Sequence, residues 1–148
     1  MATLAYNKRL RHDYTVQEEY EAGIVLTGAE VKACKLHHVS LAGAYVSERA
    51  GGLWLKNLHI SPYQVKNQPG YDPLRSRKIL LRKVEINHLL GTIKTVGLTL
   101  LPESLYTTRG LVKVKLVVGR GKKKYDKRAA IKKRDVDRRI AQALRQKI

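Results

Sequence analysis

Short segments in which apolar and polar residues alternate recur along most of the chain, and this two-residue period is typical of half-buried β-strands. Gly51 and Gly52 separate two of these segments as in a hairpin, Gly110 stands where the last two would turn, and Gly23 interrupts the first. The six predicted strands are Thr15–Leu26, Ala42–Glu48, Leu53–Ser61, Ile93–Leu101, Glu103–Thr108 and Leu111–Val118.

A helical pattern follows the first strand, over roughly Gly28–Leu36. Thr27 and Glu30 have the spacing of a capping box, in which the threonine hydroxyl accepts from the N–H of Glu30 and the glutamate carboxylate accepts from the N–H of Thr27. Leu26 and Val31 stand at the positions of a hydrophobic staple. The sequence therefore predicts a helix with a well-defined start.

A second helix is predicted over Ser76–Leu90, where the apolar positions follow a period closer to 3.6 than to 2 and Gly91 stands at the expected end. The stretch 64–76 before it contains Pro69, Gly70 and Pro73 and predicts an exposed loop. The strands and helices together predict a mainly β fold, a small antiparallel six-stranded barrel with two or three helices. Barrels of that kind often bind oligonucleotides.

Charge adds a candidate partner to this picture. The 148 residues, 43% of them hydrophobic, suffice for one domain, yet 30 Lys+Arg against 12 Asp+Glu leave a formal charge of +18. Such an excess favours a polyanionic partner, with nucleic acid as the first candidate. The sequence has no long apolar run and no signal pattern, and its single cysteine, Cys34, fits a reducing compartment, so we expect a cytoplasmic protein.

The charge is concentrated in a C-terminal tail, since residues 119–148 hold 13 basic and 3 acidic residues. If Asp126 caps a helix there, Val136 and Ile140 share a narrow apolar face, and Arg134 and Arg138 lie opposite. A stripe this thin does not fold alone in water, so we expect the tail to be disordered when free and helical on a polyanion. The alternative is a surface helix docked on the barrel.

Known catalytic and metal-binding patterns are missing from the sequence. It has neither a nucleophile elbow nor a P-loop, and adjacent His37 and His38 point in different directions on either a helix or a strand, which disfavours a shared metal. The acidic run that contains Glu18, Glu19 and Glu21 follows one strand, whereas a two-metal nuclease needs carboxylates from several elements. We therefore expect no catalytic residues, no metal and no cofactor.

Seven collinear motifs resemble the family of SsrA-binding proteins (small protein B, SmpB) of bacterial trans-translation. They are Asn7-Lys8-Arg9 with His12-Asp13-Tyr14, Glu21-Ala22-Gly23-Ile24, Gly28-x-Glu30-Val31-Lys32, His59-Ile60-x-Pro62-Tyr63, Arg75-x-Arg77-Lys78-Ile79-Leu80-Leu81, Ser104-Leu105-Tyr106 and Gly121-Lys122-Lys123-x-Tyr125-Asp126-Lys127-Arg128. The resemblance covers nearly the whole chain.

This resemblance implies an RNA-binding barrel of the oligonucleotide-binding (OB) type in residues 1–121 and a basic tail in residues 122–148. The barrel would hold the tRNA-like domain of transfer-messenger RNA, and the tail would enter the decoding centre and message channel of a stalled ribosome. Elongation factor Tu with the aminoacylated RNA is a further implied partner. The implied RNA-binding residues are Asn7, Lys8, His12, Tyr14, Glu21, Lys32 and Leu80. The implied ribosome-binding residues of the tail are Lys122, Lys123, Tyr125, Asp126, Lys127, Arg128, Val136 and Ile140.

Three positions depart from the family pattern, namely Lys35, His37 and Glu103, and they put the end of the first helix and one strand in question. Two other functions stay open from the residues alone. One is a structural protein bound permanently to ribosomal RNA, and the weaker one is a basic nuclease.

Overall fold

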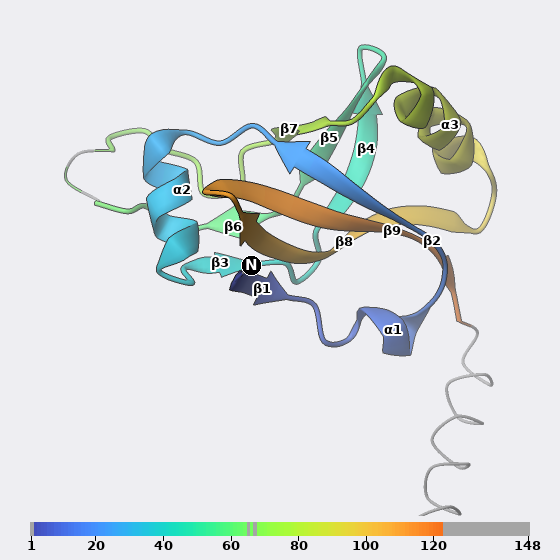
Figure 1. Ribbon diagram of the computed structural model, residues 1–148, viewed down its shortest axis with the longest axis horizontal. Coiled ribbons are helices and arrows are strands. Elements are labelled where there is room, and N and C mark those ends of the chain that lie inside the picture. Colours follow the sequence, from blue (N-terminus) through green and yellow to red (C-terminus); the bar gives the residue numbers. More distant parts are fainter. Residues whose placement is uncertain (1, 65, 67, 123–148) are drawn as a thin grey trace, which may run out of the picture.

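An antiparallel β fold occupies the part of the chain that this computed structural model describes, residues 2–64, 66 and 68–122 (Figure 1). The elements in chain order are β1 (Ala2–Tyr6), α1 (Leu10–Asp13), β2 (Tyr14–Ile24), α2 (Gly28–Lys35), β3 (Val39–Ser40), β4 (Tyr45–Arg49), β5 (Gly52–Lys56), β6 (His59–Ile60), β7 (Arg77–Leu80), α3 (Lys83–Lys94), β8 (Leu98–Thr108) and β9 (Leu111–Gly121). The mainly β class predicted from the alternating pattern is confirmed.

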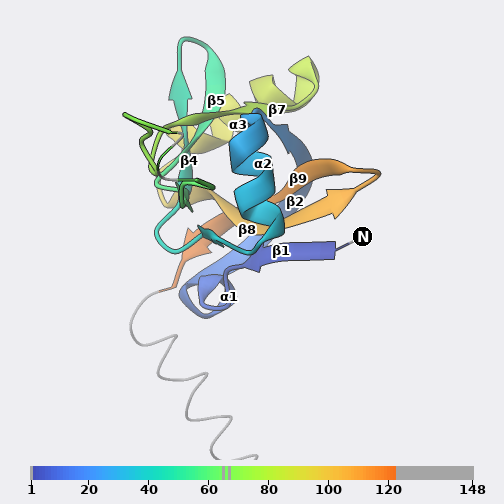
Figure 2. The same cartoon turned by 90° about the vertical axis from the view of Figure 1, so that its left-hand side faces the viewer.

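Seven strands form one sheet in the order β1-β8-β9-β2-β7-β5-β4, and β3 pairs with β6 in a second, two-stranded sheet. All the pairings are antiparallel. The sheet curls like a barrel, because β4 at one end of the order also packs against β8 near the other end. Helices α2 and α3 lie at opposite ends of the long strands β2, β8 and β9 (Figures 1 and 2).

The core lies inside this curled sheet. Leu53, Leu55, Leu105, Val114 and Leu116 are fully buried there, and α2 and α3 contribute Cys34 and Leu89. A second, smaller cluster of Leu10, Leu101 and Val117 lies between α1 and the opposite, outer face of the sheet. The sheet therefore has one face for the core and one outer face, of which α1 covers one end.

The first helix and the hairpin agree closely with the sequence. Both hydrogen bonds of the capping box are present, with Thr27 N 2.9 Å from Glu30 Oε1 and Glu30 N 3.2 Å from Thr27 Oγ1. The predicted hairpin pairs Glu48 with Leu53, but its second strand ends at Lys56 because Asn57 has φ of +60°.

The second helix was wrong at both ends. Residues 77–80 form β7, in which Arg77 and Ile79 are buried and Lys78 and Leu80 are exposed, so a two-residue period holds where a helix was predicted. Helix α3 starts only at Lys83 and continues through Gly91 to Lys94.

The prediction of the strands also differs from the structure. The segments predicted as separate strands before and after Pro102 form the single strand β8, which starts at Leu98 rather than Ile93, and a bulge between Pro102 and Ser104 absorbs Glu103. Strand β1, helix α1 and strand β3 were not predicted, and the predicted strand Leu53–Ser61 is divided into β5 and β6. The main sheet thus has seven strands where six were expected.

Candidate nucleic-acid interface

The strand register places four residues from four strands in one row across the outer face. Tyr106 of β8 pairs with Lys113 of β9, Lys113 pairs with Gly23 of β2, and Gly23 pairs with Leu80 of β7. Residues directly opposite each other in antiparallel strands share a face. Their neighbours along each strand, among them Leu105, are buried in the core, so this row faces outward.

Glu21 joins this row because it lies two residues before Gly23 on the same strand and therefore on the same face. The phenol of Tyr106 donates a hydrogen bond to Glu21 Oε2 over 2.5 Å. A groove of about 540 Å³ opens between Glu21, Leu80 and Lys113, and Leu81, Arg82 and Glu85 complete its rim. We call Glu21, Gly23, Leu80, Tyr106 and Lys113 the outer-face site. Two predicted RNA-binding residues, Glu21 and Leu80, thus come together.

Leu80 offers an apolar surface to solvent, since the residue is 50% exposed. The absence of a side chain on Gly23 permits this position, because a Cβ there would lie 3.3 Å from the Cβ of Leu80. Lys115, two residues further along β9, pairs with Glu19 and Glu103, whereas Lys113 has no ion-pair partner among the described residues. The site combines an apolar surface, a carboxylate acceptor and a cation, which suit the face of a base, its edge and a phosphate respectively.

A network of four charged side chains links this face to α1. Glu103, which is buried, pairs with Arg11 of α1 over 2.8 Å and with Lys115 over 3.2 Å, and Glu19 pairs with the same two cations over 2.6 and 3.4 Å. Burial raises the pKa of Glu103, but the hydrogen bonds from Arg11 and Lys115 outweigh it, and the net shift is downward. The departure of Glu103 from the family pattern is therefore matched by two cations.

Three other predicted residues meet elsewhere. Asn7, Lys8 and Tyr14 line a cleft of about 820 Å³ between the segments 5–10 and 39–45, together with Asp13, Thr99 and Leu101. We call this the N-terminal cleft. His12 lies on α1 between Arg11 and Asp13 but does not line the cleft. The predicted RNA-binding residues are consequently dispersed, since some line the outer-face site, others line the N-terminal cleft, and His12 lines neither.

Lys32 lies apart from both the outer-face site and the N-terminal cleft, on the exposed side of α2, with its Nζ 5.5 Å from the centre of the Tyr63 ring.

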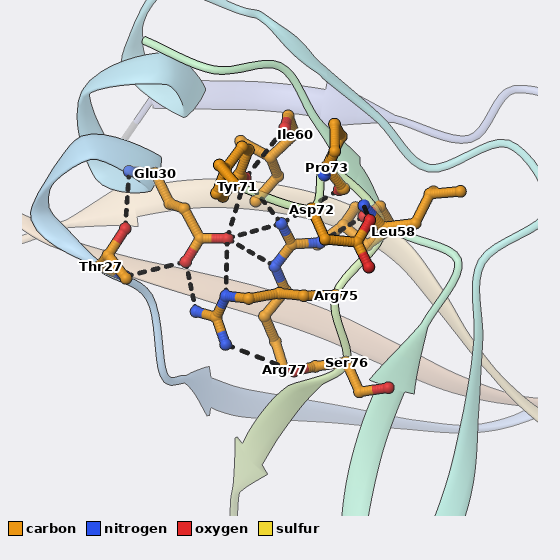
Figure 3. Close-up of polar contacts among 11 residues, drawn as sticks. Thr27, Glu30, Leu58, Ile60, Tyr71, Asp72, Pro73, Arg75, Ser76 and Arg77 are labelled. Carbon is orange, nitrogen blue, oxygen red and sulfur yellow. Dashed lines mark hydrogen bonds and ion pairs between the residues drawn. The ribbon is translucent and has the colours of Figure 1, made fainter. Parts of the chain in front are cut away.

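A buried polar network holds α2 in place (Figure 3). The carboxylate of Glu30 accepts from Arg75, from Arg77 Nε over 2.8 Å and from the phenol of Tyr71 over 3.1 Å. The loop and β7 are thereby joined to α2.

The ionised form of Glu30 is strongly favoured. Burial alone raises the pKa of this carboxyl, but hydrogen bonds from Arg75, the Thr27 N–H and Arg77 lower it to about 2. At the C-terminal end of α2, the left-handed position that glycine usually occupies is taken by His37, with φ of +62°. The Nδ1 of His37 lies 3.1 Å from the carbonyl oxygen of Leu4.

The first residue of the predicted tail is bound to the barrel. The backbone N–H of Lys122 donates to the carbonyl of Asp13 over 2.9 Å, and its Nζ donates to the carbonyl of Arg11 over 3.1 Å. The seven other predicted ribosome-binding residues lie outside the described residues, and so does the predicted tail helix. They are Lys123, Tyr125, Asp126, Lys127, Arg128, Val136 and Ile140.

Tyr106 and Lys113 were not assigned a role from the sequence. Lys113 was visible only as one polar position of an alternating strand, and Tyr106 only as part of a motif, because pairing between strands decides which residues share a row. Within the described ranges no group of three or more His, Cys, Asp and Glu side chains could hold a metal ion. Nor does any helix there have the length and apolar character to cross a membrane.

Comparisons with known proteins all identify the same family. A family model described as SmpB protein matches residues 4–146. A protein named SsrA-binding protein from Geobacillus sp. (strain WCH70) is 47% identical and aligns over 97% of this chain and 93% of its own. Another of that name from Neorickettsia sennetsu is 48% identical over 95% and 97%. A solved structure described as "tmRNA-SmpB: a journey to the center of the bacterial ribosome" is 45% identical, with a TM-score of 0.67 over 80% of this chain and 84% of that one.

Proposed function

This chain belongs to the SmpB family, and we propose that it is an RNA-binding factor that holds the tRNA-like domain of transfer-messenger RNA and delivers it to stalled ribosomes in the cytoplasm. It has no catalytic role of its own in this scheme, and elongation factor Tu joins it through the aminoacylated RNA. The observation that carries the proposal is the outer-face site, where Glu21, Leu80 and Lys113 meet around one groove.

The outer-face site supplies more than charge. Leu80 can pack against an unstacked base, Lys113 can bind a phosphate, and Glu21 can accept from donors on a base edge or a ribose. A carboxylate would only repel phosphates, so its presence beside Lys113 favours recognition of RNA features other than the backbone. The site therefore suits selection of one folded RNA.

The N-terminal cleft is proposed as a second area of RNA contact. Lys8 is an exposed cation at its rim, and Asn7 can both donate and accept hydrogen bonds. His12 on α1 and Lys32 beside Tyr63 are proposed as further RNA contacts outside these two areas. A tRNA-like domain is wide enough to contact several such patches at once.

The tail is proposed to act at the ribosome. Two features of the sequence support this proposal. Residues 119–148 are strongly basic, and the spacing of Val136 and Ile140 would place them on one face of a helix, opposite the basic residues. Replacing Val136 and Ile140 with serine should spare binding of the tRNA-like domain and impair tagging of stalled chains. Equal loss of both activities would contradict a separate role for the tail.

Charge-matched variants test the outer-face site. Lys113→Ala is expected to weaken binding of the isolated tRNA-like domain by about 10-fold or more, because a hydrogen bond from a charged group is worth about 1.5–3 kcal/mol. Lys94→Ala removes the same charge at the far end of α3, from a side chain 72% exposed, and should change the affinity less than about 2-fold. Equal effects of the two variants would mean that Lys113 contributes only non-specific electrostatic attraction, which would contradict the site.

A permanent ribosomal protein is the second candidate, since a charge of +18 also suits ribosomal RNA. Sedimentation of ribosomes in high salt separates the two functions. A delivery factor washes off the subunits, whereas a structural component sediments with them.

A further inference from the structure

The Tyr106 phenol occupies a position that RNA binding alone does not explain. Its side chain is almost fully enclosed, 8% exposed, yet its hydroxyl reaches the exposed carboxylate of Glu21 and donates to Oε2 over 2.5 Å. Burial, followed by this hydrogen bond, raises the pKa of Tyr106, so the phenol stays a proton donor throughout the physiological range.

This contact fixes a side chain that would otherwise rotate freely. An exposed glutamate has several rotamers, and an RNA that binds it must first restrict them to one. A hydrogen bond to an ionised oxygen at this distance is of the strong, charge-assisted kind. With Oε2 held by Tyr106, Oε1 is the carboxylate oxygen left to accept from a ligand.

Strand pairing and burial also restrict movement of the tyrosine itself. Tyr106 lies near the end of β8, where its backbone is paired on one side with Thr3 of β1 and on the other with Lys113 of β9. Because its ring is almost fully enclosed, Tyr106 has less freedom to rotate than exposed Glu21. The carboxylate therefore follows the tyrosine.

We propose that Tyr106 is a positioning residue for RNA recognition, which holds Glu21 in the orientation that accepts a hydrogen bond from the tRNA-like domain. This inference rests on the proposed function of the outer-face site. Tyr106 itself makes no contact with RNA in it. The purpose of the bond is to lower the cost of ordering Glu21 when RNA arrives.

A double-mutant cycle in the full-length protein tests the inference. Tyr106→Phe removes one oxygen and keeps the ring, so the fold is retained, which circular dichroism and thermal melting verify. We expect it to weaken binding of the tRNA-like domain by about 3–10-fold, the usual range for ordering one long side chain. In the Glu21→Gln background the same change should have no further effect.

The salt dependence of RNA binding provides a second measurement, because a variant that had lost its fold would change it. Tyr106→Phe leaves every charge in place, so the slope of log affinity against log salt should equal that of the parent. Tyr20→Phe is the matched control, because Tyr20 donates to Glu18 over 2.6 Å in another tyrosine–glutamate pair outside the site. It should leave the affinity unchanged.

The outcomes separate this inference from the proposed function. Weaker binding by Glu21→Gln with no effect of Tyr106→Phe overturns the positioning role and leaves the site intact. Equal weakening by Tyr106→Phe in both backgrounds, or a changed salt slope, also overturns it. If Glu21→Gln, Lys113→Ala and Tyr106→Phe all bind like the parent, the outer-face site itself is wrong.

Discussion

Glu30 is the residue on which the position of α2 depends most. Its carboxylate is buried with Arg77, whose side chain is also fully enclosed, and Arg75 shares the same carboxylate from a partly exposed position. Two guanidiniums around one carboxylate leave one excess positive charge, to which the carbonyls of Leu58 and Pro73 and the phenol of Tyr71 also bind. A buried charge left without its partner costs far more than the pair contributes.

Glu30→Gln is therefore expected to destabilise the protein by about 3–5 kcal/mol, because it leaves buried Arg77 without a counter-charge. The measurement is the free energy of unfolding from urea titration. Glu85→Gln is the control, since Glu85 pairs with an Arg82 side chain that is 86% exposed and should contribute less than about 1 kcal/mol. Equal losses in the two variants would contradict the importance of burial.

Acid should weaken the fold through the same residue. The pKa of Glu30 is lowered from 4.5 to about 2, so the unfolded chain binds its proton first and the stability from this carboxylate is present above pH 4.5. It is lost as the pH falls from 4.5 toward 2. Unfolding free energies measured across this window should fall steeply for the parent protein and less steeply for Glu30→Gln. Parallel curves would contradict this assignment.

At the scale of elements, a helix or strand could be predicted where the interactions that form it lie close together in the sequence. Helix α2 was predicted with its start because the Thr27–Glu30 bonds lie within four residues of sequence. Strand β7 was predicted as helix because Ile79 and Leu80 are both apolar, although only Ile79 enters the core. Leu80 is apolar at the surface, and a pattern of hydrophobicity cannot separate an exposed leucine from a buried one.

The β8–β9 turn carries an element-scale prediction. Arg109 and Gly110 have φ of +52° and +77°, as a two-residue turn of type I′ requires, and arginine is a costly choice at the first position. Arg109→Asn should stabilise the protein by about 0.5–1 kcal/mol, because asparagine tolerates this backbone region better. Thermal unfolding measures the gain. Gly110→Ala should destabilise the same turn, and a lower melting temperature for both variants would contradict the reasoning.

At the scale of the whole molecule, the sheet brings together residues that the sequence keeps far apart. Glu21 and Leu80 were assigned to RNA through a family resemblance, while the row that joins them to Tyr106 and Lys113 depends on the pairing of four strands. Pairing between distant strands leaves no local pattern, so the partners of Glu21 could not be derived beforehand. The same pairing separates the N-terminal cleft from the outer-face site.

The proposed division between barrel and tail leads to the last prediction. Residues 123–148 carry 11 basic and 3 acidic residues, but every residue of the outer-face site and the N-terminal cleft precedes them. A chain of residues 1–122 should therefore bind the tRNA-like domain within about 3-fold of the full-length affinity at physiological salt. Full-length protein should bind an unrelated RNA of equal length more tightly at low salt, with a steeper salt dependence, because the tail neutralises phosphates without regard to sequence.

Titrations of both chains with both RNAs over a range of salt concentrations measure these differences. Retention of Lys122 in the shorter chain matters, because its bonds to the carbonyls of Asp13 and Arg11 fasten the end of β9 to α1 beside His12. If the shorter chain lost its preference for the tRNA-like domain over the unrelated RNA, selectivity would have to come from the tail. If it kept the preference and lost only the salt-dependent binding of any RNA, recognition would lie on the barrel, and the excess charge would serve a different polyanion.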